Sequence, residues 1–384
     1  MSADHGRPEG AMKVLYISPH ASLGGAERVT MDLIAGHDRA VVAPSVCFLA
    51  EGPLVEHCRS ALGVPTTVLP RPRLRSFGQR RRTIRALADL VREQGIELVH
   101  SAMAWGHALG GRAAAKAARP AVWYQHNRAS WGSAVEVSAA LVKARTILAN
   151  SAFTAADQHR VNPRRTPIEV VHYGTVLPAE PRERRRERGR EALGLAEGDF
   201  AVGIAARLQR WKGQDVVLRA AASLLRAREN ARLLVIGGSL FGLEPEFAEE
   251  LKRLAGTLGI ADRVTFTGFR QDIPDCLAAL DVVVHASVHP EPFGLALIEG
   301  MAAGTALVAA DAGAVREIVT PGADGLLVPP GDHEALAVAL LALYDDSELR
   351  WRLARAGERT ARERFDAAVM TRHVEAVYAE ILRR

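Results

Sequence analysis

The sequence contains little cysteine, and its cysteines are scattered. Cys47, Cys58 and Cys276 form no C-x-x-C pair, and no H-E-x-x-H occurs anywhere in the chain. A disulfide framework or a structural zinc site needs clustered ligands, so this spacing argues against both. We therefore expect a protein of a reducing compartment, the cytoplasm.

Long apolar stretches are also missing. No run of about 18 apolar residues occurs, so we expect no membrane-spanning helix. Residues 1–10 are polar and lack the apolar centre of a signal peptide. The 384 residues are 48% hydrophobic and 24% charged, which is the composition of a globular chain long enough for two domains.

Lysine is scarce, and arginine supplies most of the positive charge. The chain has five lysines, a net charge of +5 and a calculated pI of about 9.4. Arg71–Arg82 holds six arginines and no acid, with Leu74 and Phe77 among them. Three interpretations remain open: peripheral contact with anionic lipid at the inner membrane face, a grip on an anionic acceptor, or a mobile surface loop. No nucleic-acid recognition module is visible, so we expect no nucleic-acid partner.

Short β-branched runs alternate with helical patterns in the first half of the chain. Gly24 and Gly25 follow the first of these runs and precede a predicted helix near residues 26–35. The alternation predicts β-α units on a parallel sheet. The predicted strands span residues 14–18, 41–48, 66–69, 98–101, 122–125, 146–149 and 168–171.

This alternation stops at residues 178–189, where prolines precede a run of charge. Residues 182–190 carry six arginines and two glutamates, which fits either a linker or the start of a solvated helix. A second series of β-α units then begins, so we place the domain boundary near residue 180. Its predicted strands span residues 201–205, 233–236, 264–267, 282–285 and 306–309, and its helices residues 216–227, 245–258, 295–303, 334–343, 347–365 and 367–382.

The stretch from Glu291 to residue 304 carries the strongest chemical signal. Two carboxylates, Glu291 and Glu299, lie eight positions apart. Pro292 and Gly294 predict that Glu291 lies in a loop and that a helix begins after Gly294. The unpaired N–H groups at that helix start suit a phosphate, and flanking carboxylates bind hydroxyls. The combination suggests a sugar nucleotide.

Two glycines and two cations follow the first strands of the two domains. Gly24 and Gly25 lack the third glycine of G-x-G-x-x-G, so they fit either an anion site or a tight β-α turn. Arg207 and Lys212 follow the strand at 201–205, where two cations could neutralise a diphosphate leaving group. Ligands of such sheets bind at the carboxyl ends of the strands, so we expect the site in a cleft between the domains.

In their order along the chain, these features resemble a retaining glycosyltransferase of family 4. Further marks are Thr267–Arg270, Ala312–Ala314 with Glu317, and Gly325–Pro329, so the resemblance covers nearly the whole chain. It implies the GT-B fold, an α/β arrangement of two Rossmann-like domains facing across a cleft. The expected division is an acceptor domain at 1–180, a donor domain at 181–365, and a final helix in 366–384 that packs back on the first domain.

The resemblance also implies roles for individual residues. Arg207 and Lys212 would hold the donor phosphates, Glu291 the hydroxyls of the transferred sugar, and Glu299 the ribose. The other expected donor contacts are backbone at Phe293, Gly294 and Leu295, the loop of Phe269 and Arg270 beside the base, Gly24 and Gly25 near the diphosphate, and His126 beside the sugar. The chain departs from the family pattern at Asn150–Ser151, Tyr173–Gly174 and Asp311–Ala314.

The expected reaction moves a sugar from a nucleoside diphosphate sugar, uridine being favoured, to a hydroxyl acceptor with retention of configuration. The acceptor remains open among lipid-linked saccharides, glycans and cyclitol or aminoglycoside precursors. No D-x-D occurs, so we expect neither an essential metal nor another cofactor. The alternatives are a GT-B epimerase or phosphorylase and a non-catalytic nucleotide-binding protein.

Overall fold

The chain forms two compact units, each with its own parallel sheet. The computed structural model describes residues 10–22, 24–73, 75–239 and 244–383. The first unit comprises the chain up to Val176 together with the segment from Ala367 onward, and the second comprises Leu177–Asp366. The borders predicted from the sequence lie after residues 180 and 365. Leu74, named above in the basic stretch, lies outside the described residues.

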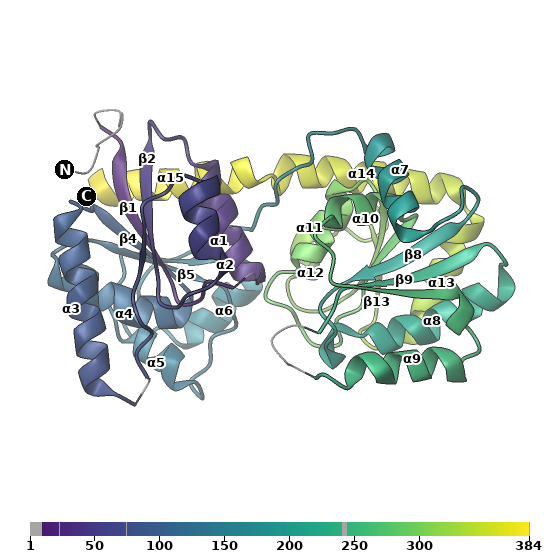
Figure 1. Ribbon diagram of the computed structural model, residues 1–384, viewed down its shortest axis with the longest axis horizontal. Coiled ribbons are helices and arrows are strands. Elements are labelled where there is room, and N and C mark those ends of the chain that lie inside the picture. Colours follow the sequence, from purple (N-terminus) through teal and green to yellow (C-terminus); the bar gives the residue numbers. More distant parts are fainter. Residues whose placement is uncertain (1–9, 23, 74, 240–243, 384) are drawn as a thin grey trace. The chain divides into compact units, whose positions relative to one another are not determined.

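The first unit is a seven-stranded sheet in the order β3-β2-β1-β4-β5-β6-β7, and every pair is parallel (Figure 1). The chain winds outward from β1 in one direction and then from β4 in the other, as in a doubly wound fold. The strands are β1 Met12–Ser18, β2 Val42–Phe48, β3 Thr66–Val68, β4 Leu98–Ala102, β5 Ala121–Gln125, β6 Thr146–Ala149 and β7 Ile168–Val170.

Helices of the first unit bury apolar faces against this sheet. Helices α3, α4 and α5 pack side by side, and α15 packs against α1. Leu87 and Val91 of α3 are buried in one core with Ile17 of β1. The helices are α1 Gly25–Gly36, α2 Pro53–Glu56, α3 Phe77–Glu93, α4 Met103–Lys116, α5 Ala134–Ala140, α6 Ala152–Arg160 and α15 Ala367–Arg383, with a π-turn at His57–Ala61.

The C-terminal helix α15 is fastened to the first unit by buried polar groups. Tyr378 Oη lies 2.6 Å from His100 Nδ1 on β4 and 2.8 Å from Tyr16 Oη on β1. Glu375 Oε1 lies 2.8 Å from His37 Nδ1, and the other ring nitrogen of His37 reaches Tyr16 Oη at 2.5 Å. These hydrogen bonds satisfy hydroxyl and imidazole groups that are removed from water.

The second unit is a six-stranded parallel sheet in the order β10-β9-β8-β11-β12-β13. Its strands are β8 Phe200–Ala205, β9 Ala231–Ile236, β10 Val264–Gly268, β11 Val282–His285, β12 Ala306–Ala310 and β13 Leu326–Val328. The sequence analysis does not predict β13 as a strand. Its helices are α7 Arg182–Leu193, α8 Gln214–Ala227, α9 Phe247–Thr257, α10 Ile273–Ala279, α11 Leu295–Ala302, α12 Val315–Ile318, α13 His333–Asp345 and α14 Ser347–Arg364, with 3-10 turns at Arg210–Lys212 and Ala261–Arg263.

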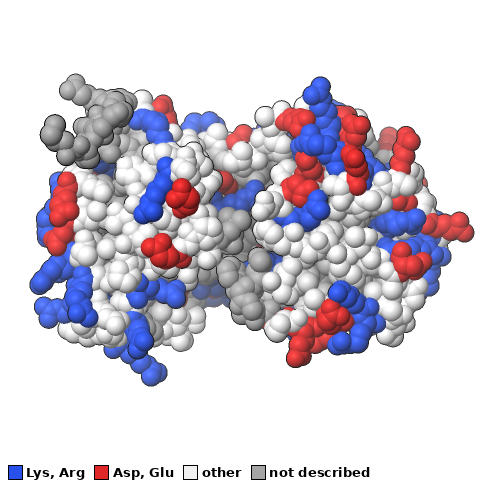
Figure 2. Space-filling view, in the orientation of Figure 1, with Lys and Arg blue, Asp and Glu red and all other residues white. Residues whose placement is uncertain are grey.

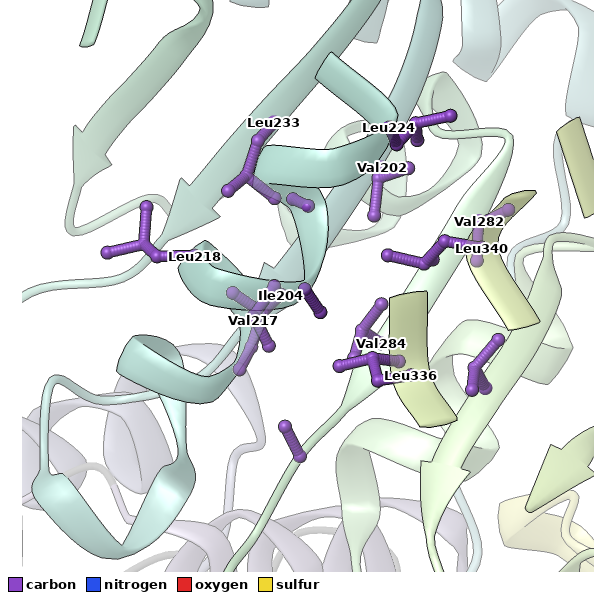
Figure 3. Packing of buried hydrophobic residues seen from close by; sticks show 14 of the residues in the cluster. Val202, Ile204, Val217, Leu218, Leu224, Leu233, Val282, Val284, Leu336 and Leu340 are labelled. Carbon is purple, nitrogen blue, oxygen red and sulfur yellow. The ribbon is translucent and has the colours of Figure 1, made fainter. Parts of the chain in front are cut away.

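The core of the second unit lies between this sheet and helices α8 and α13 (Figure 3). Val202, Ile204 and Val284 from the strands meet Val217 of α8 and Leu340 of α13. All five are buried, which accounts for the near-continuous apolar runs in the strand sequences.

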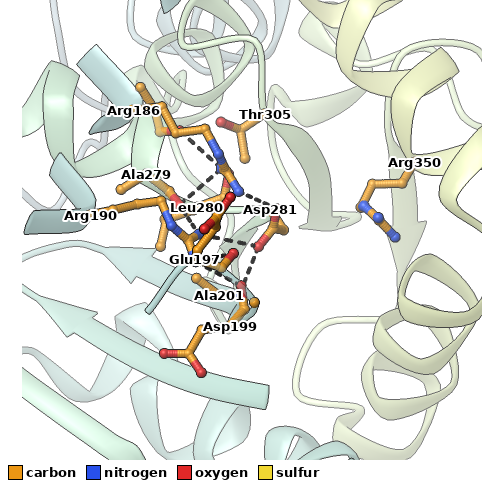
Figure 4. A network of polar contacts seen from close by, with 12 residues as sticks. Arg186, Arg190, Glu197, Asp199, Ala201, Ala279, Leu280, Asp281, Thr305 and Arg350 are labelled. Atoms are coloured by element: carbon orange, nitrogen blue, oxygen red, sulfur yellow. Dashed lines mark hydrogen bonds and ion pairs between the residues drawn. The ribbon is translucent and has the colours of Figure 1, made fainter. Parts of the chain in front are cut away.

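The charged run at 182–190 lies in helix α7, so the linker alternative is wrong. One face of the helix is solvated, with Arg184 and Arg188 exposed, and the other face is packed. Arg186 donates to the carbonyls of Ala279 and Leu280, both at 3.0 Å, and to Asp281 at 2.8 Å (Figure 4). Arg190 also donates to the Ala279 carbonyl, at 3.3 Å. The arginines of α7 thus satisfy carbonyls at the end of α10 that have no partner within that helix.

Candidate functional site

The predicted donor residues of the second unit gather at the carboxyl ends of β8 and β11, the neighbouring strands at which the winding direction reverses. Lys212 ends the 3-10 turn that follows β8, and Glu291 lies in the loop after β11. Gly213 has φ of 73°, and a Cβ there would lie 2.1 Å from the Ala286 carbonyl oxygen. The two loops therefore touch at a position that only glycine fits. Ligands of open α/β sheets bind at this reversal point.

Glu291 is a buried carboxylate held by three side chains. Its Oε1 lies 2.5 Å from Lys212 Nζ and 3.1 Å from His285 Nε2, and it accepts a hydrogen bond from Ser287 Oγ. Burial opposes ionisation of Glu291, but the charges and hydrogen bonds of His285 and Lys212 outweigh it. The pKa of Glu291 therefore lies well below its ordinary value, and the group is a carboxylate at neutral pH.

The two cations of this loop differ in their surroundings. Lys212 Nζ lies 4.0 Å from the centroid of the Trp211 ring, in addition to its ion pair with Glu291. Arg207 is half-buried, and its guanidinium forms no hydrogen bond or ion pair with any other described residue. Arg207 thus presents a positive charge that the described protein leaves unneutralised.

Helix α11 begins beside Glu291, as the sequence predicts. Gly294 caps it with φ of 112°, and Leu295 is its first residue. Phe293 is buried with its ring 6.0 Å from that of Phe365, so its backbone rather than its side chain faces the helix start. Glu299 lies half-buried within the helix, one turn after Leu295.

The segment Asp311–Ala314, which departs from the family pattern, retains a glycine where its backbone meets that of Glu291. Gly313 has φ of 68°, and a Cβ there would lie 2.3 Å from the Glu291 carbonyl oxygen. The Glu291 and Gly313 backbones form an isolated parallel bridge, and the Ala314 N–H donates to the Glu291 carbonyl at 3.2 Å. Glu291 is therefore fixed through its backbone as well as its side chain.

The loop after β10 places Phe269 and Arg270 at the same edge of the sheet. The Phe269 side chain is 54% exposed, which is unusual for a phenylalanine. Arg270 forms a bidentate pair with Asp272, with Nε 2.8 Å from Oδ1. An exposed ring beside a held guanidinium offers a flat surface to a planar group.

The glycine motif of the first unit opens α1. Gly24 is the N-cap of α1, and Gly25 is its first residue. A Cβ on Gly24 would lie 2.4 Å from Glu27 Oε2, so the buried Glu27 carboxylate folds back over the start of the helix. A carboxylate already occupies the position that an anion would take there.

His126 directly follows β5 and is almost completely buried in the first unit. Its Nδ1 lies 2.5 Å from Tyr173 Oη, and its carbonyl accepts from Asn150 Nδ2 at 3.2 Å. Burial lowers the pKa of His126 to about 3, so the ring is neutral at physiological pH. Its Nε2 has no hydrogen-bond partner among the described residues.

Sequence reasoning missed His285, Ser287 and Tyr173. His285 was assigned to a strand, and its place as the last residue of β11 was the signal that the sequence offered. Within the described ranges, no group of three or more His, Cys, Asp or Glu side chains is arranged to hold a metal, and no helix is long and apolar enough to cross a membrane.

Two family models match the chain. The model of glycosyl transferases group 1 matches residues 185–360, and the model of glycosyltransferase family 4 matches residues 23–177. The two matches are consecutive and together take in most of both units.

Curated relatives match over about half of this chain. The lipopolysaccharide core biosynthesis mannosyltransferase LpsB of Rhizobium meliloti is 35% identical over 203 residues, 52% of this chain and 56% of the relative. The D-inositol 3-phosphate glycosyltransferase of Mycobacterium marinum is 39% identical over 185 residues, 47% of this chain and 38% of the relative. The chain thus spans about half the length of the curated relatives it matches.

Solved structures match over nearly the whole chain. Anabaena Alr3699/HepE, in complex with UDP and glucose, is 28% identical with a TM-score of 0.84, covering 96% of this chain and 99% of that one. WaaG, a glycosyltransferase involved in lipopolysaccharide biosynthesis, is 18% identical with a TM-score of 0.69, covering 95% and 99%. The likeness to WaaG extends to the fold, which is the GT-B arrangement of two Rossmann-like parallel α/β units.

Proposed function

The chain belongs to the glycosyltransferases of group 1 and family 4, and we propose that it moves a sugar from a nucleoside diphosphate sugar to a hydroxyl acceptor. The observation that carries this proposal is the meeting of Lys212 and Glu291 beside the start of α11. A cation, a helix N-terminus and an ionised carboxylate in one place suit a diphosphate joined to a sugar.

The favoured donor is a UDP-sugar. HepE, whose sequence is 28% identical over nearly all of this chain, is described in complexes with UDP and with UDP-glucose. In this chain, Phe269 and Arg270 would lie against the base, and Glu299 would accept hydrogen bonds from the ribose hydroxyls. The roles of Phe293, Gly294 and Leu295 would be limited to their backbone groups.

The proposed reaction retains configuration at the anomeric carbon. The bond from that carbon to the diphosphate oxygen breaks, and a bond to the acceptor oxygen forms on the same face. The acceptor proton leaves with the diphosphate. Arg207 and Lys212 would stabilise the negative charge that develops on the leaving group, and the ionised Glu291 the positive charge that develops on the sugar. In this proposal, the two cations and the start of α11 supply the positive charge that stabilises the leaving diphosphate, and no metal is essential.

His126 has a different role in this proposal. Its ring is neutral at physiological pH, because burial lowers its pKa to about 3. A neutral ring suits a hydrogen bond to an uncharged sugar hydroxyl rather than proton transfer, and the buried, unpartnered Nε2 would have to be uncovered to make that bond.

The acceptor is a carbohydrate or a carbohydrate-like alcohol in this proposal. The names of the relatives point to lipopolysaccharide core and to inositol phosphate, both of which present sugar-like hydroxyls. Their matched segments cover only part of each relative, so these acceptors define a class to test.

We also propose that the first unit contacts an anionic membrane surface through α3 and the segment before it. Arg73, Arg75, Arg81 and Arg82 are exposed there, and Phe77 is 69% exposed. The chain that follows α3 adds no exposed acid to this unit over residues 98–168, because its only carboxylates there, Glu136 and Asp157, are buried. Figure 2 shows basic side chains along the α3 side of this unit. Such a surface suits peripheral binding at the cytoplasmic face.

The test of the function is a donor screen followed by product analysis. UDP, GDP and their common sugar conjugates are added to the full chain, and the melting temperature is measured. A true donor raises it by mass action. The selected donor is then incubated with lipid-linked saccharides, free glycans and cyclitols, and product masses are recorded.

We expect one nucleotide family to stabilise the chain and one acceptor class to gain the mass of one sugar. Release of free nucleotide only with an acceptor supports transfer. Epimerised donor or phosphate-dependent cleavage without an acceptor would instead identify an epimerase or a phosphorylase. Stabilisation by no nucleotide sugar would overturn the proposal.

A further inference from the structure

All three side chains that hold Glu291 meet the same carboxylate oxygen. Lys212 Nζ, His285 Nε2 and Ser287 Oγ converge on Oε1. No described side chain donates a hydrogen bond to the second oxygen, Oε2. The carboxylate is thus anchored through Oε1.

His285 is built to donate to this oxygen. It is the last residue of β11 and is 6% exposed, and its Nδ1 has no partner among the described residues. A buried N–H without a partner is costly, and an ionised carboxylate only accepts. The proton therefore belongs on Nε2, where it points at Oε1. A Cβ on Gly294 would lie 3.7 Å from Nε2, so the ring also lies beneath the start of α11.

Lys212 alone is a poor anchor for Glu291. Its ammonium is the group that a diphosphate would attract, so the ion pair weakens just when the donor binds. His285 and Ser287 both point at Oε1 from buried positions, so they can hold Glu291 while Lys212 turns to the phosphate. Glu291 then stays fixed beside the sugar throughout the proposed reaction.

We propose that His285 and Ser287 are positioning residues that fix Glu291 through Oε1 and thereby present Oε2 to a hydroxyl of the donor sugar. This inference rests on the proposed glycosyltransferase function. In this proposal, the residues at the end of β11 help to recognise the sugar and do not contribute to binding of the nucleotide.

The test compares binding of sugar-bearing and sugar-free nucleotides. The ligands are UDP-glucose and GDP-mannose, each paired with UDP or GDP, and Kd is measured by calorimetry. His285→Leu combined with Ser287→Ala removes both hydrogen-bond donors that hold Oε1 besides Lys212. His285→Gln combined with Ser287→Thr keeps a donor at each position and is the matched control. Melting temperatures confirm that each variant is folded.

We expect the first double variant to bind the nucleotide sugar about tenfold more weakly, since two hydrogen bonds to Glu291 are lost, while UDP or GDP binds as in the wild type. The control double variant should keep most of the sugar affinity. In a Glu291→Gln background, His285→Leu should weaken sugar binding by less than twofold, because His285 acts through Glu291.

Unchanged sugar affinity in the first variant, or equal losses for the nucleotide and the nucleotide sugar, would overturn the positioning role. An additive effect in the Glu291→Gln background would also overturn it. A wild-type chain that binds no nucleotide sugar would overturn the proposed function itself, so the two failures are distinguishable.

Discussion

At Glu291, burial and charge act in opposite directions. The side chain is 8% exposed, and a carboxylate in such a place is normally protonated more easily than in water. Lys212 and His285 reverse this effect and keep the pKa low. The site thus holds a negative charge in a nonaqueous setting, where its influence on a neighbouring cationic centre is stronger than in water.

Replacement of Lys212 by alanine is expected to lower kcat at least a hundredfold, because it removes a cation from both the leaving group and Glu291. Lys212→Arg keeps the charge and should retain more activity than the alanine variant. Initial rates with the selected donor, together with circular dichroism spectra, provide the measurement. Near-normal transfer by a folded Lys212→Ala variant would contradict the assigned role.

The sequence predicts Lys212 at a strand end and Glu291 in a loop but does not pair them. They lie 79 residues apart, and their contact depends on β8 and β11 being neighbours in the sheet. Strand order is a tertiary property that local patterns do not encode. His285 was missed for a related reason, because a lone polar residue closing the run Val282–His285 looks like part of a buried strand.

At the scale of elements, α7 and α3 show how differently two arginine-rich runs behave. Arg185 and Arg190 of α7 turn inward and are buried against backbone carbonyls. Hydrophobic periodicity does not reveal this arrangement, so the sequence suggested solvation. In α3, Thr83, Ile84 and Leu87 are buried while the neighbouring arginines remain in solvent.

The exposed arginines of α3 provide a test of membrane contact. Arg75, Arg81 and Arg82 changed together to glutamine should weaken binding to vesicles containing phosphatidylserine about a hundredfold, since each cation near an anionic surface contributes about 1 kcal/mol. Vesicle flotation measures the effect. The matched control changes Arg226, Arg253 and Arg359, exposed arginines of the second unit, and should bind as the wild type does.

Equal binding of the wild type to vesicles of phosphatidylcholine alone would contradict an electrostatic contact. Binding to anionic vesicles that is unaffected by the α3 substitutions would place the contact on another surface.

At the scale of the whole molecule, the alternation of apolar runs and helices predicted two α/β units because buried parallel strands are continuously apolar. Most strand positions follow from this pattern. The three-residue strand β13 is not among the predicted strands, although β3 and β7, which are equally short, are. The buried titratable groups of the first unit were also not predicted, because their burial depends on α15 and on neighbouring strands.

These buried groups predict a pH-dependent stability of the first unit. Burial lowers the pKa of His37, His100, His107 and His126, to about 4 for His107 and about 3 for His126. The unfolded chain then binds more protons than the folded one below about pH 6.5, so stability falls as pH falls. His107 and His126 should each lower the free energy of unfolding by about 2 kcal/mol when the pH falls from 7 to 5.

Glu136 acts in the opposite sense. Burial raises its pKa to about 7, so the folded state binds more protons than the unfolded state between about pH 7 and pH 4.5, and Glu136 offsets roughly one histidine. Thermal unfolding at pH 7, 6 and 5 should show a net loss of stability, steeper in Glu136→Gln. Equal melting temperatures across this range, or a shallower loss in the variant, would contradict the prediction.

The attachment of α15 has a consequence for biosynthesis. Tyr16 and His100 are made early, yet their hydrogen-bond partner Tyr378 is translated only after the entire second unit. During translation, the second unit, which is continuous in sequence, can fold before the first unit is complete. Until α15 is synthesised, Tyr16 and His100 of the first unit lack their hydrogen bonds to Tyr378. Folding of the first unit is therefore completed only when α15 packs against it.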